Sequence, residues 1–398
     1  MIDFQITEEQ QLIKKTVREF GERKITPHFE HIQQKKEIPQ SIIDGMAELG
    51  LIACTTDIKY GGAHLNPLTA GIIAGELARA DPTGSVPVFY LVQTAWGYVL
   101  DKYGTEQAKQ EIFPQVLKGK WFLGIATTEA DIGSDVISMK SQIQPTTEGY
   151  ILNGQKMYIS GVKEAYTRGG GHVTLAKQNA QAGSRGLTMF YLPLKQKGIE
   201  PVYLEDMGRE GLSTGGFYMD NVKIPKHYLI GKENQGFKIV HEGYEFARAM
   251  ITVICANMGK WAIEQAIEYA QARQAFGKTL AHNQGVQFPL AEGYAQMEAL
   301  ELLGYKALWI FEQEILGKAG RFDVSKQVAL GKMVCMDWGF KAINDALQIF
   351  GAFGYTHECQ VQAALRAIRS FGWAEGAKEI MKVIVAREII GKEYVANK

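Results

Sequence analysis

The chain has 398 residues, of which 46% are hydrophobic and 22% charged, so it is long enough for two or three domains with substantial cores. Its 43 basic and 43 acidic side chains balance, which argues against partners such as nucleic acid or an anionic membrane surface. Because no apolar run approaches the roughly 20 residues that span a bilayer and the four cysteines form no C-x-x-C pair, we expect a cytoplasmic protein without membrane insertion, disulfides or structural zinc.

Helical periodicity dominates the first part of the chain. Thr7 followed by Gln10 predicts a capped helix start, and the N-terminus lacks the basic and apolar segments of a signal peptide. One apolar stripe has helical spacing: Ile13, Val17 and Phe20. We therefore predict an N-terminal helical domain over residues 1–120.

The pattern changes between residues 121 and 228. Short runs of β-branched and aromatic residues, such as GYILNGQKMYIS and GGFYMDNVKIP, are separated by Gly, Asn and Pro, which predicts a small antiparallel β domain. Over residues 229–398 long helical periods return, and apolar side chains within 325–350 recur at intervals of three and four, as in an antiparallel bundle. The predicted fold is α+β, with an N-terminal helical domain, a middle antiparallel β domain and a C-terminal four-helix bundle.

Several common site motifs are absent from the sequence. There is no G-x-G-x-x-G after a predicted strand, no G-x-x-x-x-G-K-[ST], no G-x-S-x-G and no H-E-x-x-H. His28 and His31 stand in a polar stretch without a third ligand, so a solvated surface is favoured there over a metal site.

Four short segments could bind a ligand, and each has a simpler structural interpretation. The loop ATTEADIGSDV (126–136) offers hydroxyls and backbone N–H groups to a polar ring or phosphate, or is a polar turn. KMYISG (156–161) places an aromatic ring and a hydroxyl at a strand edge. Arg273 in RQAFGK could hold a diphosphate or interact with a helix dipole. The glycines of ALQIFGAFGY (346–355) could simply end a helix.

Taken together and in order, these segments resemble the acyl-CoA dehydrogenase family of flavoproteins. The matching patterns are TExxxGSD, NGxKxxIS, RxxFGK, the GxxGY turn and the tail VIVAREII, and they cover essentially the whole chain. The resemblance implies noncovalent FAD without a Rossmann motif, a homotetramer, and dehydrogenation of an acyl-CoA thioester to a 2-enoyl-CoA. It also implies that the electrons pass to an electron-transfer flavoprotein.

The resemblance carries site residues onto this sequence. For the flavin ring it implies the loop residues Ile125, Thr127, Thr128, Gly133 and Ser134, and beside the N5 edge Tyr158, Ile159 and Ser160. For the FAD diphosphate and adenosine of a neighbouring subunit it implies Arg273, Phe276, Gln284, Gln348 and Gly351, with Ala377 and Glu379 near the diphosphate. For the CoA thioester it implies Ser134, Ser184, Glu245, Arg248 and Gly376.

Glu375, in FGWAEGAKEI, falls on the most common catalytic base of the family. Abstraction of a weakly acidic α-proton needs a carboxylate with a raised pKa, which burial among apolar groups such as Phe371 and Trp373 would provide. From the residues alone, a carboxylate that interacts with the dipole of the last helix is an alternative. Ala247, where some relatives carry the base, cannot accept a proton.

This sequence also departs from the family pattern. Ala377 and Glu379 replace a common Thr and Gln, which adds a negative charge near the expected diphosphate, and Glu210 stands where a basic residue is common. Two other functions therefore stay open. One is a flavin monooxygenase or nitroalkane oxidase of the same fold, and the other is a relative that binds CoA esters or partner helices without turnover.

Overall fold

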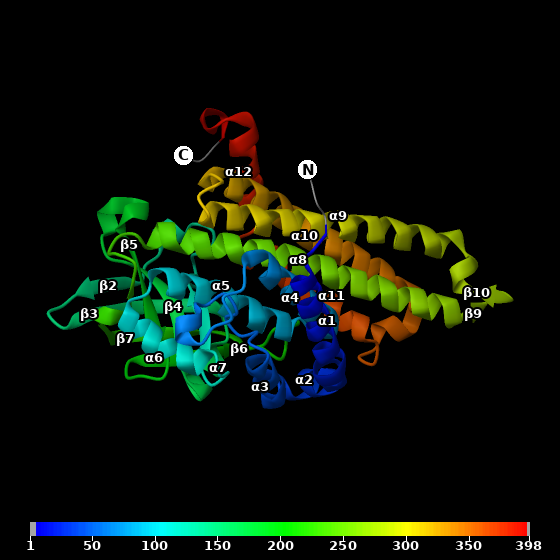
Figure 1. Cartoon of the computed structure of the whole chain (residues 1–398), viewed down its shortest axis with the longest axis horizontal. Coiled ribbons are helices and arrows are strands. Elements are labelled where there is room, and N and C mark those ends of the chain that lie inside the picture. Colours follow the sequence, from blue (N-terminus) through cyan, green and yellow to red (C-terminus); the bar gives the residue numbers. More distant parts are fainter. Residues whose placement is uncertain (1–4, 396–398) are drawn as a thin grey trace.

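The order helix, strand, helix is confirmed in the computed structural model, which describes residues 5–395 (Figure 1). The helices of the first region are α1 (Glu8–Phe20), α2 (Phe29–Lys35), α3 (Gln40–Glu48), α4 (Pro67–Ala80), α5 (Ser85–Tyr103) and α6 (Glu106–Val116). The predicted start of α1 is confirmed, because the Gln10 N–H donates to Thr7 Oγ1 at 3.2 Å and the Thr7 N–H donates to Gln10 Oε1 at 3.0 Å.

The middle region is one sheet with a short helix, α7 (Val162–Arg168). Its strands are β1 (Phe122–Ala126), β2 (Gln142–Pro145), β3 (Gly149–Ser160), β4 (Gly170–Lys177), β5 (Leu187–Pro193), β6 (Ile199–Leu204), β7 (Thr214–Pro225) and β8 (Leu229–Ile230). The strand order is β6-β7-β3-β2-β4-β5-β8, and β1 pairs with β4. The sheet is mixed, not purely antiparallel, because β4 pairs in parallel with β1 and β2. Parallel pairing needs a long connection, which sequence patterns do not specify.

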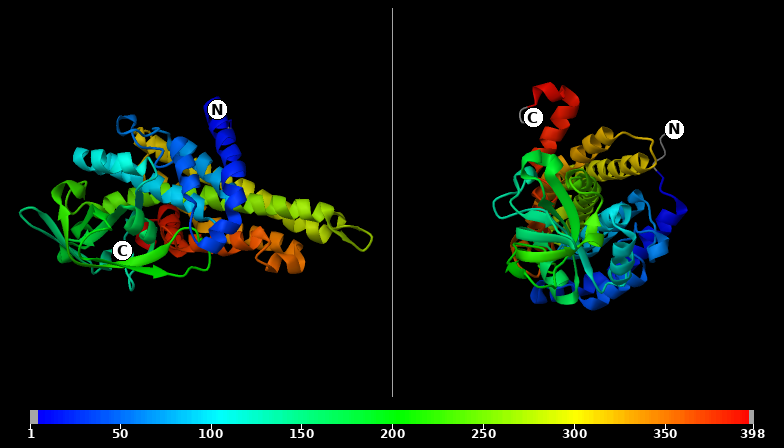
Figure 2. Two further views of the ribbon diagram at one scale, coloured as in Figure 1. Left: turned by 90° about the horizontal axis from the view of Figure 1, so that it is seen from below. Right: turned by 90° about the vertical axis from the view of Figure 1, so that its left-hand side faces the viewer.

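Three long helices form the last region: α8 (Gly236–Ala272), α9 (Gln284–Ile315) and α10 (Arg321–Ile349). Two shorter helices, α11 (Gln360–Ile368) and α12 (Lys378–Ile390), pack on α10. A small hairpin of β9 (Gln274–Ala275) and β10 (Lys278–Thr279) joins α8 to α9. The sheet lies at one end of this long bundle and the hairpin at the other, while α12 projects from the body (Figures 1 and 2).

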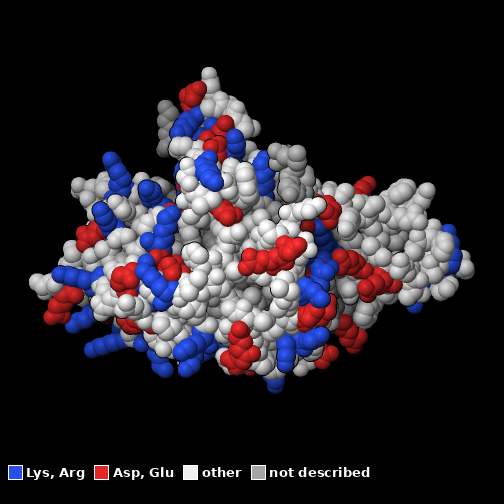
Figure 3. Space-filling model, viewed as in Figure 1, with Lys and Arg blue, Asp and Glu red and all other residues white. Residues whose placement is uncertain are grey.

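Helix α8 lies at the centre of the molecule and contacts α4, α5, α9 and α10. One continuous apolar core therefore joins all three regions. A second, small cluster of Ala329, Met381 and Val385 holds α12 against α10. On the face in Figure 3, acidic and basic side chains are interspersed, as expected from the balanced composition. Among residues 5–395 no helix is long and apolar enough to cross a membrane.

Candidate active site

Glu375 lies in a tight loop immediately before α12. Its φ of +58° and the φ of +112° at Gly376 are both left-handed, a conformation that costs a non-glycine residue on the order of 1 kcal/mol or more. Such a backbone persists only where surrounding groups hold it. Because α12 begins at Lys378, Glu375 precedes the helix and does not belong to its first turn.

Two buried cations hold this loop through its carbonyl groups. Arg248 of α8 donates from Nε to the Glu375 carbonyl at 2.6 Å. Lys332 of α10 donates from Nζ to the carbonyls of Phe371 and Gly376, at 2.7 and 3.2 Å. Both cations are almost fully buried, with 4% and 1% of their surface exposed, so the carbonyls replace the water that a charged group requires. A Cβ at position 376 would lie 3.0 Å from the guanidinium of Arg248, which explains the glycine there.

The carboxyl group of Glu375 has the properties of a base that works near neutral pH. Burial raises its pKa to about 7, and the positive charges of Arg248 and Lys332 limit the rise. The residue as a whole keeps some access to solvent in this chain. A carboxyl group that is partly ionised near pH 7 can take a proton from a molecule bound against it.

The expected packing around Glu375 is only half right. Phe371 is buried, with 1% of its surface exposed, but Trp373 is 61% exposed, so the prediction that it buries the carboxylate is wrong. The Arg369 guanidinium lies 5.9 Å from the centroid of the Trp373 ring, so the indole takes part in a cation–π contact near the surface.

Tyr244 connects the Glu375 loop to the loop after β1. Its hydroxyl lies 2.6 Å from Thr127 Oγ1, and the Arg248 guanidinium lies 5.2 Å from its ring centroid. Burial raises the pKa of the Tyr244 hydroxyl, and the negative charge of Glu375 adds to this rise. Three segments far apart in the sequence, 126–136, 244–248 and 371–377, therefore meet at one place.

A buried ion pair fixes the loop after β1 to β3. Lys156 Nζ lies 3.1 Å from Glu129 Oε1 and donates to the Thr127 carbonyl at 3.0 Å. The Met157 N–H donates to the Thr128 carbonyl at 3.0 Å. The predicted ring-binding residues of the loop thus lie beside those of β3, namely Tyr158, Ile159 and Ser160.

This ion pair should be essential for stability. Both side chains are at most 2% exposed, so Lys156→Met leaves a buried carboxylate without its counterion and should cost about 3–5 kcal/mol. Urea denaturation of Lys156→Met and of the double variant Lys156→Met/Glu129→Gln provides the measurement. The double variant should recover part of the loss, and a single variant as stable as the parent would refute this account of the loop.

Other predicted substrate residues lie near this place. Glu245 is buried and forms an ion pair with Arg321 at 2.6 Å and a hydrogen bond with the Ser325 hydroxyl, while burial raises its pKa to about 7. Ser184 lies in a short helical segment, Ala180–Gly186, that packs beside the Val136–Ser138 turn following Ser134.

The predicted diphosphate and adenosine residues form a second group at the hairpin end of the bundle. Arg273, Phe276, Gln284, Gln348 and Gly351 are all exposed. The ends of α8 and α10 meet there, with the Tyr269 and Phe350 rings 4.6 Å apart. At ~1.5 Å per residue, Arg273 lies about 37 Å along α8 from Arg248, so one chain does not bring the two groups together.

The sequence patterns of the acyl-CoA dehydrogenase N-terminal, middle and C-terminal domains match residues 7–120, 124–222 and 234–390. Glutaryl-CoA dehydrogenase of Desulfococcus multivorans is 30% identical over 394 residues, which cover 98% of each chain. The chain belongs to the acyl-CoA dehydrogenase family. Caffeyl-CoA reductase-Etf complex subunit CarC of Acetobacterium woodii is 27% identical over 97% of this chain and 99% of its own.

Solved structures of acyl-CoA dehydrogenases share the fold of this family member. The structure of a glutaryl-coenzyme A dehydrogenase in complex with glutaryl-CoA superposes with a TM-score of 0.91 at 29% identity, covering 100% of this chain and 99% of the other. The expected family and fold class are thereby confirmed.

The structure shows how the acidic residues that depart from the family pattern are accommodated. Glu210 forms an ion pair with Arg366 of α11, so an acidic residue is accommodated there. Glu379 is exposed, and its neighbour Lys378 pairs with Asp337 at 2.8 Å.

Among residues 5–395 no group of three or more His, Cys, Asp or Glu side chains could hold a metal ion.

Lys332 and Tyr244 are the important residues that the sequence reasoning missed. Lys332 interrupts the apolar run ALGKMVCM, and a lysine within such a run of a predicted helix indicates a buried cation that needs polar partners. Tyr244 lies one turn before Arg248 on the same face of α8, but only the fold places its hydroxyl against Thr127.

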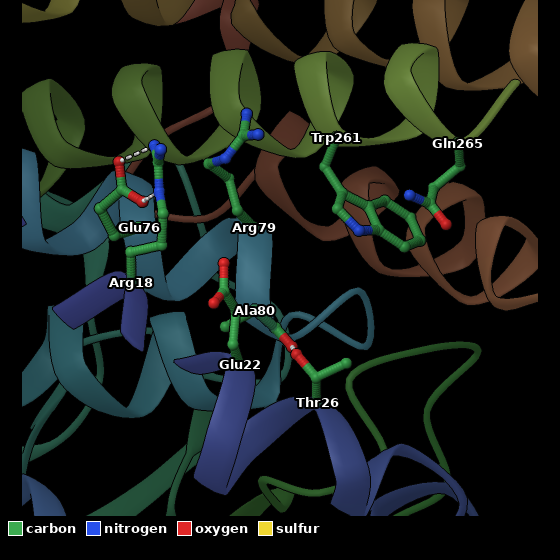
Figure 4. Close-up of a pocket in the computed structure, with 8 residues that line it drawn as sticks. All are labelled: Arg18, Glu22, Thr26, Glu76, Arg79, Ala80, Trp261 and Gln265. Atoms are coloured by element: carbon green, nitrogen blue, oxygen red, sulfur yellow. Dashed lines mark hydrogen bonds and ion pairs between the residues drawn. The ribbon is translucent and has the colours of Figure 1, made fainter. Parts of the chain in front are cut away.

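A separate pocket of about 300 Å³ lies between α1, α4 and α8 (Figure 4). Three of its four charged groups are already paired: Arg18 donates to both carboxylate oxygens of Glu76 at 2.8 and 3.0 Å, and Arg79 forms an ion pair with Glu264 at 2.5 Å. Trp261, which lines it, lies ~20 Å along α8 from Arg248 at ~1.5 Å per residue. The pocket is therefore remote from Glu375.

Proposed function

We propose that this family member is an FAD-dependent enzyme that dehydrogenates an acyl-CoA thioester at C2 and C3 to give a 2-enoyl-CoA. The observation that carries the proposal is the environment of Glu375, a carboxyl group with a pKa near 7 in a loop held by two buried cations. Its position next to Tyr244 and the loop after β1 supports the assignment of the surrounding residues to cofactor and substrate.

The residues around Thr128 fit a flavin. Tyr158 presents a flat ring that is 61% exposed, with a left-handed φ of +62° that turns the strand at this point. A Cβ at Gly133 would have no neighbour within 4 Å among the described residues, so the loop leaves open space beside the hydroxyl of Ser134. An open surface with an aromatic ring and small donors suits a planar, hydrogen-bonding ring system. FAD bound there would supply the acceptor for the hydride from C3.

We assign the proton transfer to the protein. The Glu375 carboxylate removes the proton from C2, and Gly376 lets the backbone approach the thioester. Arg248 and Lys332 fix the loop that carries the base and counteract the effect of burial, so that part of the carboxyl population is ionised at neutral pH. Ser134, Ser184 and Glu245 are proposed to line the CoA moiety.

We further propose that the enzyme is a homotetramer and passes its electrons to an electron-transfer flavoprotein. The second group of predicted FAD residues is too far from the first to serve the same cofactor within one chain, which supports a contribution from another copy. Exposed apolar side chains on α9 and the hairpin support such contacts: Phe276, Phe288, Leu302 and Trp309. The relative from Acetobacterium woodii is named as part of an Etf complex, which supports the electron acceptor.

An anaerobic screen tests the proposed function. Acyl-CoA thioesters with linear, branched, cyclic and dicarboxylic acyl groups are added to the purified protein while the visible absorbance of flavin is followed. We expect at least one thioester to bleach the flavin and yield its 2-enoyl-CoA. A yellow protein that none of them bleaches would contradict the proposal, and oxygen consumption without enoyl-CoA would favour the monooxygenase.

The rate should depend on pH through the base. Because the carboxylate form of Glu375 is the active one and its pKa is about 7, kcat/KM should rise with pH and level off above this value. Glu245 also has a pKa of about 7, so Glu245→Gln is the control. The fall in rate at acid pH should remain in Glu245→Gln even if the maximal rate changes. If it disappeared in this variant, the pH dependence would belong to Glu245 and not to Glu375.

A further inference from the structure

Arg209, between β6 and β7, is a buried guanidinium with incomplete pairing. Its side chain is only 11% exposed, and its φ of +62° is left-handed. Nη1 donates to Ser160 Oγ at 3.3 Å and Nη2 donates to Thr214 Oγ1 at 3.1 Å. Its Nε has no hydrogen-bond partner among residues 5–395. An arginine that is buried with a free donor needs an explanation, because a buried and unsatisfied donor is costly.

The charge of Arg209 is only partly compensated. Asp206 Oδ2 lies 3.6 Å from Nη2, too far for a good hydrogen bond, and the Asp206 side chain is 25% exposed. The hydrocarbon part of Arg209 packs near Gly84 and Ala367, since a Cβ at Gly84 would lie 3.7 Å from Arg209 Cγ and 3.2 Å from Ala367 Cβ. Thr214, Asp206 and the apolar contact near Gly84 thus hold the Arg209 guanidinium against Ser160. A guanidinium keeps its positive charge at this position.

We propose that Arg209 is a positioning residue that orients the Ser160 hydroxyl toward the flavin and provides a positive field that favours the reduced cofactor. The inference rests on the proposed function, in which Ser160 lies beside the N5 edge. A hydride brings two electrons and one proton, so the cofactor gains one negative charge on reduction. A buried cation nearby stabilises that charge more than a solvated one would, because little water screens it.

The midpoint potential of the bound flavin is the measurement, since a purely structural residue would not shift it in a charge-dependent way. Arg209→Gln should lower the midpoint potential by about 30 mV. For a two-electron couple this shift corresponds to a tenfold change in the equilibrium ratio of reduced to oxidised flavin. Arg209→Lys keeps the charge and should stay close to the parent. Asp206→Asn removes the counter-charge and should shift the potential upward.

Opposite shifts in Arg209→Gln and Asp206→Asn would support the inference. An unchanged potential in FAD-loaded Arg209→Gln would overturn it. If Arg209→Gln does not fold, Asp206→Asn decides, and a potential that does not rise in this variant overturns the inference as well. A parent protein that binds no FAD would instead refute the proposed function, so the two failures are distinguishable.

Discussion

Replacing Glu375 by Gln should slow flavin reduction by acyl-CoA on the order of 10³-fold while the protein stays yellow. The amide keeps the shape of the side chain but cannot accept the proton from C2. The backbone contacts of the loop, in which Arg248 bonds to the carbonyl of residue 375, do not depend on the carboxyl group and should persist. Stopped-flow absorbance under anaerobic conditions measures the effect.

A control variant accompanies Glu375→Gln. Glu148→Gln changes an exposed carboxylate in the turn between β2 and β3 and should leave the rate unchanged.

The stability of the Glu375→Gln variant gives a second readout that needs no cofactor. Because the folded state raises the pKa of Glu375 from 4.5 to about 7, the folded protein retains a proton that the unfolded chain loses in this range. The parent should therefore lose stability relative to Glu375→Gln as pH rises from 4.5 to 7. A Gln variant with the parent rate of flavin reduction would remove Glu375 from the mechanism.

Replacing Lys332 by Met should have the second largest effect. The carbonyls of Phe371 and Gly376 would lose their donor, and the left-handed conformation of the Glu375 loop would lose part of its support. Because a displacement of about 1 Å can cost on the order of 10²-fold in rate, we expect a fall of this size in kcat. FAD binding should be retained, because among residues 5–395 the Lys332 ammonium donates to the carbonyls of Phe371 and Gly376 and has no hydrogen bond to the loop after β1.

Lys341→Met is the matched control for Lys332→Met. Lys341 is an exposed lysine on the same helix and pairs with Asp345 four residues later, a contact worth about 0.3–0.5 kcal/mol. It should change neither kcat nor the flavin spectrum. If Lys332→Met turned over at the rate of Lys341→Met, the buried ammonium would not position the base.

Local patterns predicted the elements of the fold well. The Thr7 cap depends on side chains three residues apart, and the α10 stripe, with Met336 and Ile343 buried, depends on helical spacing alone. The parallel pairing of β1 with β4 joins segments more than forty residues apart, about which periodicity carries no information. Sequence therefore predicted which elements form, and the fold was needed to show how the strands pair.

The candidate site was also predictable only in part: local motifs pointed to individual residues, and the fold was needed to show their partners. The motif around Glu375 led to its proposal as the base, but the two cations that hold its loop come from α8 and α10, and no local pattern links them to position 375. The role expected for Trp373 was wrong because its contact with Arg369 on the surface was not foreseeable from hydrophobicity. The separation of Arg273 from Arg248 follows from the 37-residue length of α8, which the sequence pattern did not define.

The central claim, that Glu375 removes the proton from C2, is tested most directly by flavin reduction with a thioester deuterated at C2. The thioester that bleaches the flavin fastest is used with and without deuterium across the pH range, in stopped-flow experiments without oxygen. The account predicts slower reduction of the deuterated compound and a rate that rises with pH through about 7. A rate that is insensitive to both deuterium and pH would contradict it.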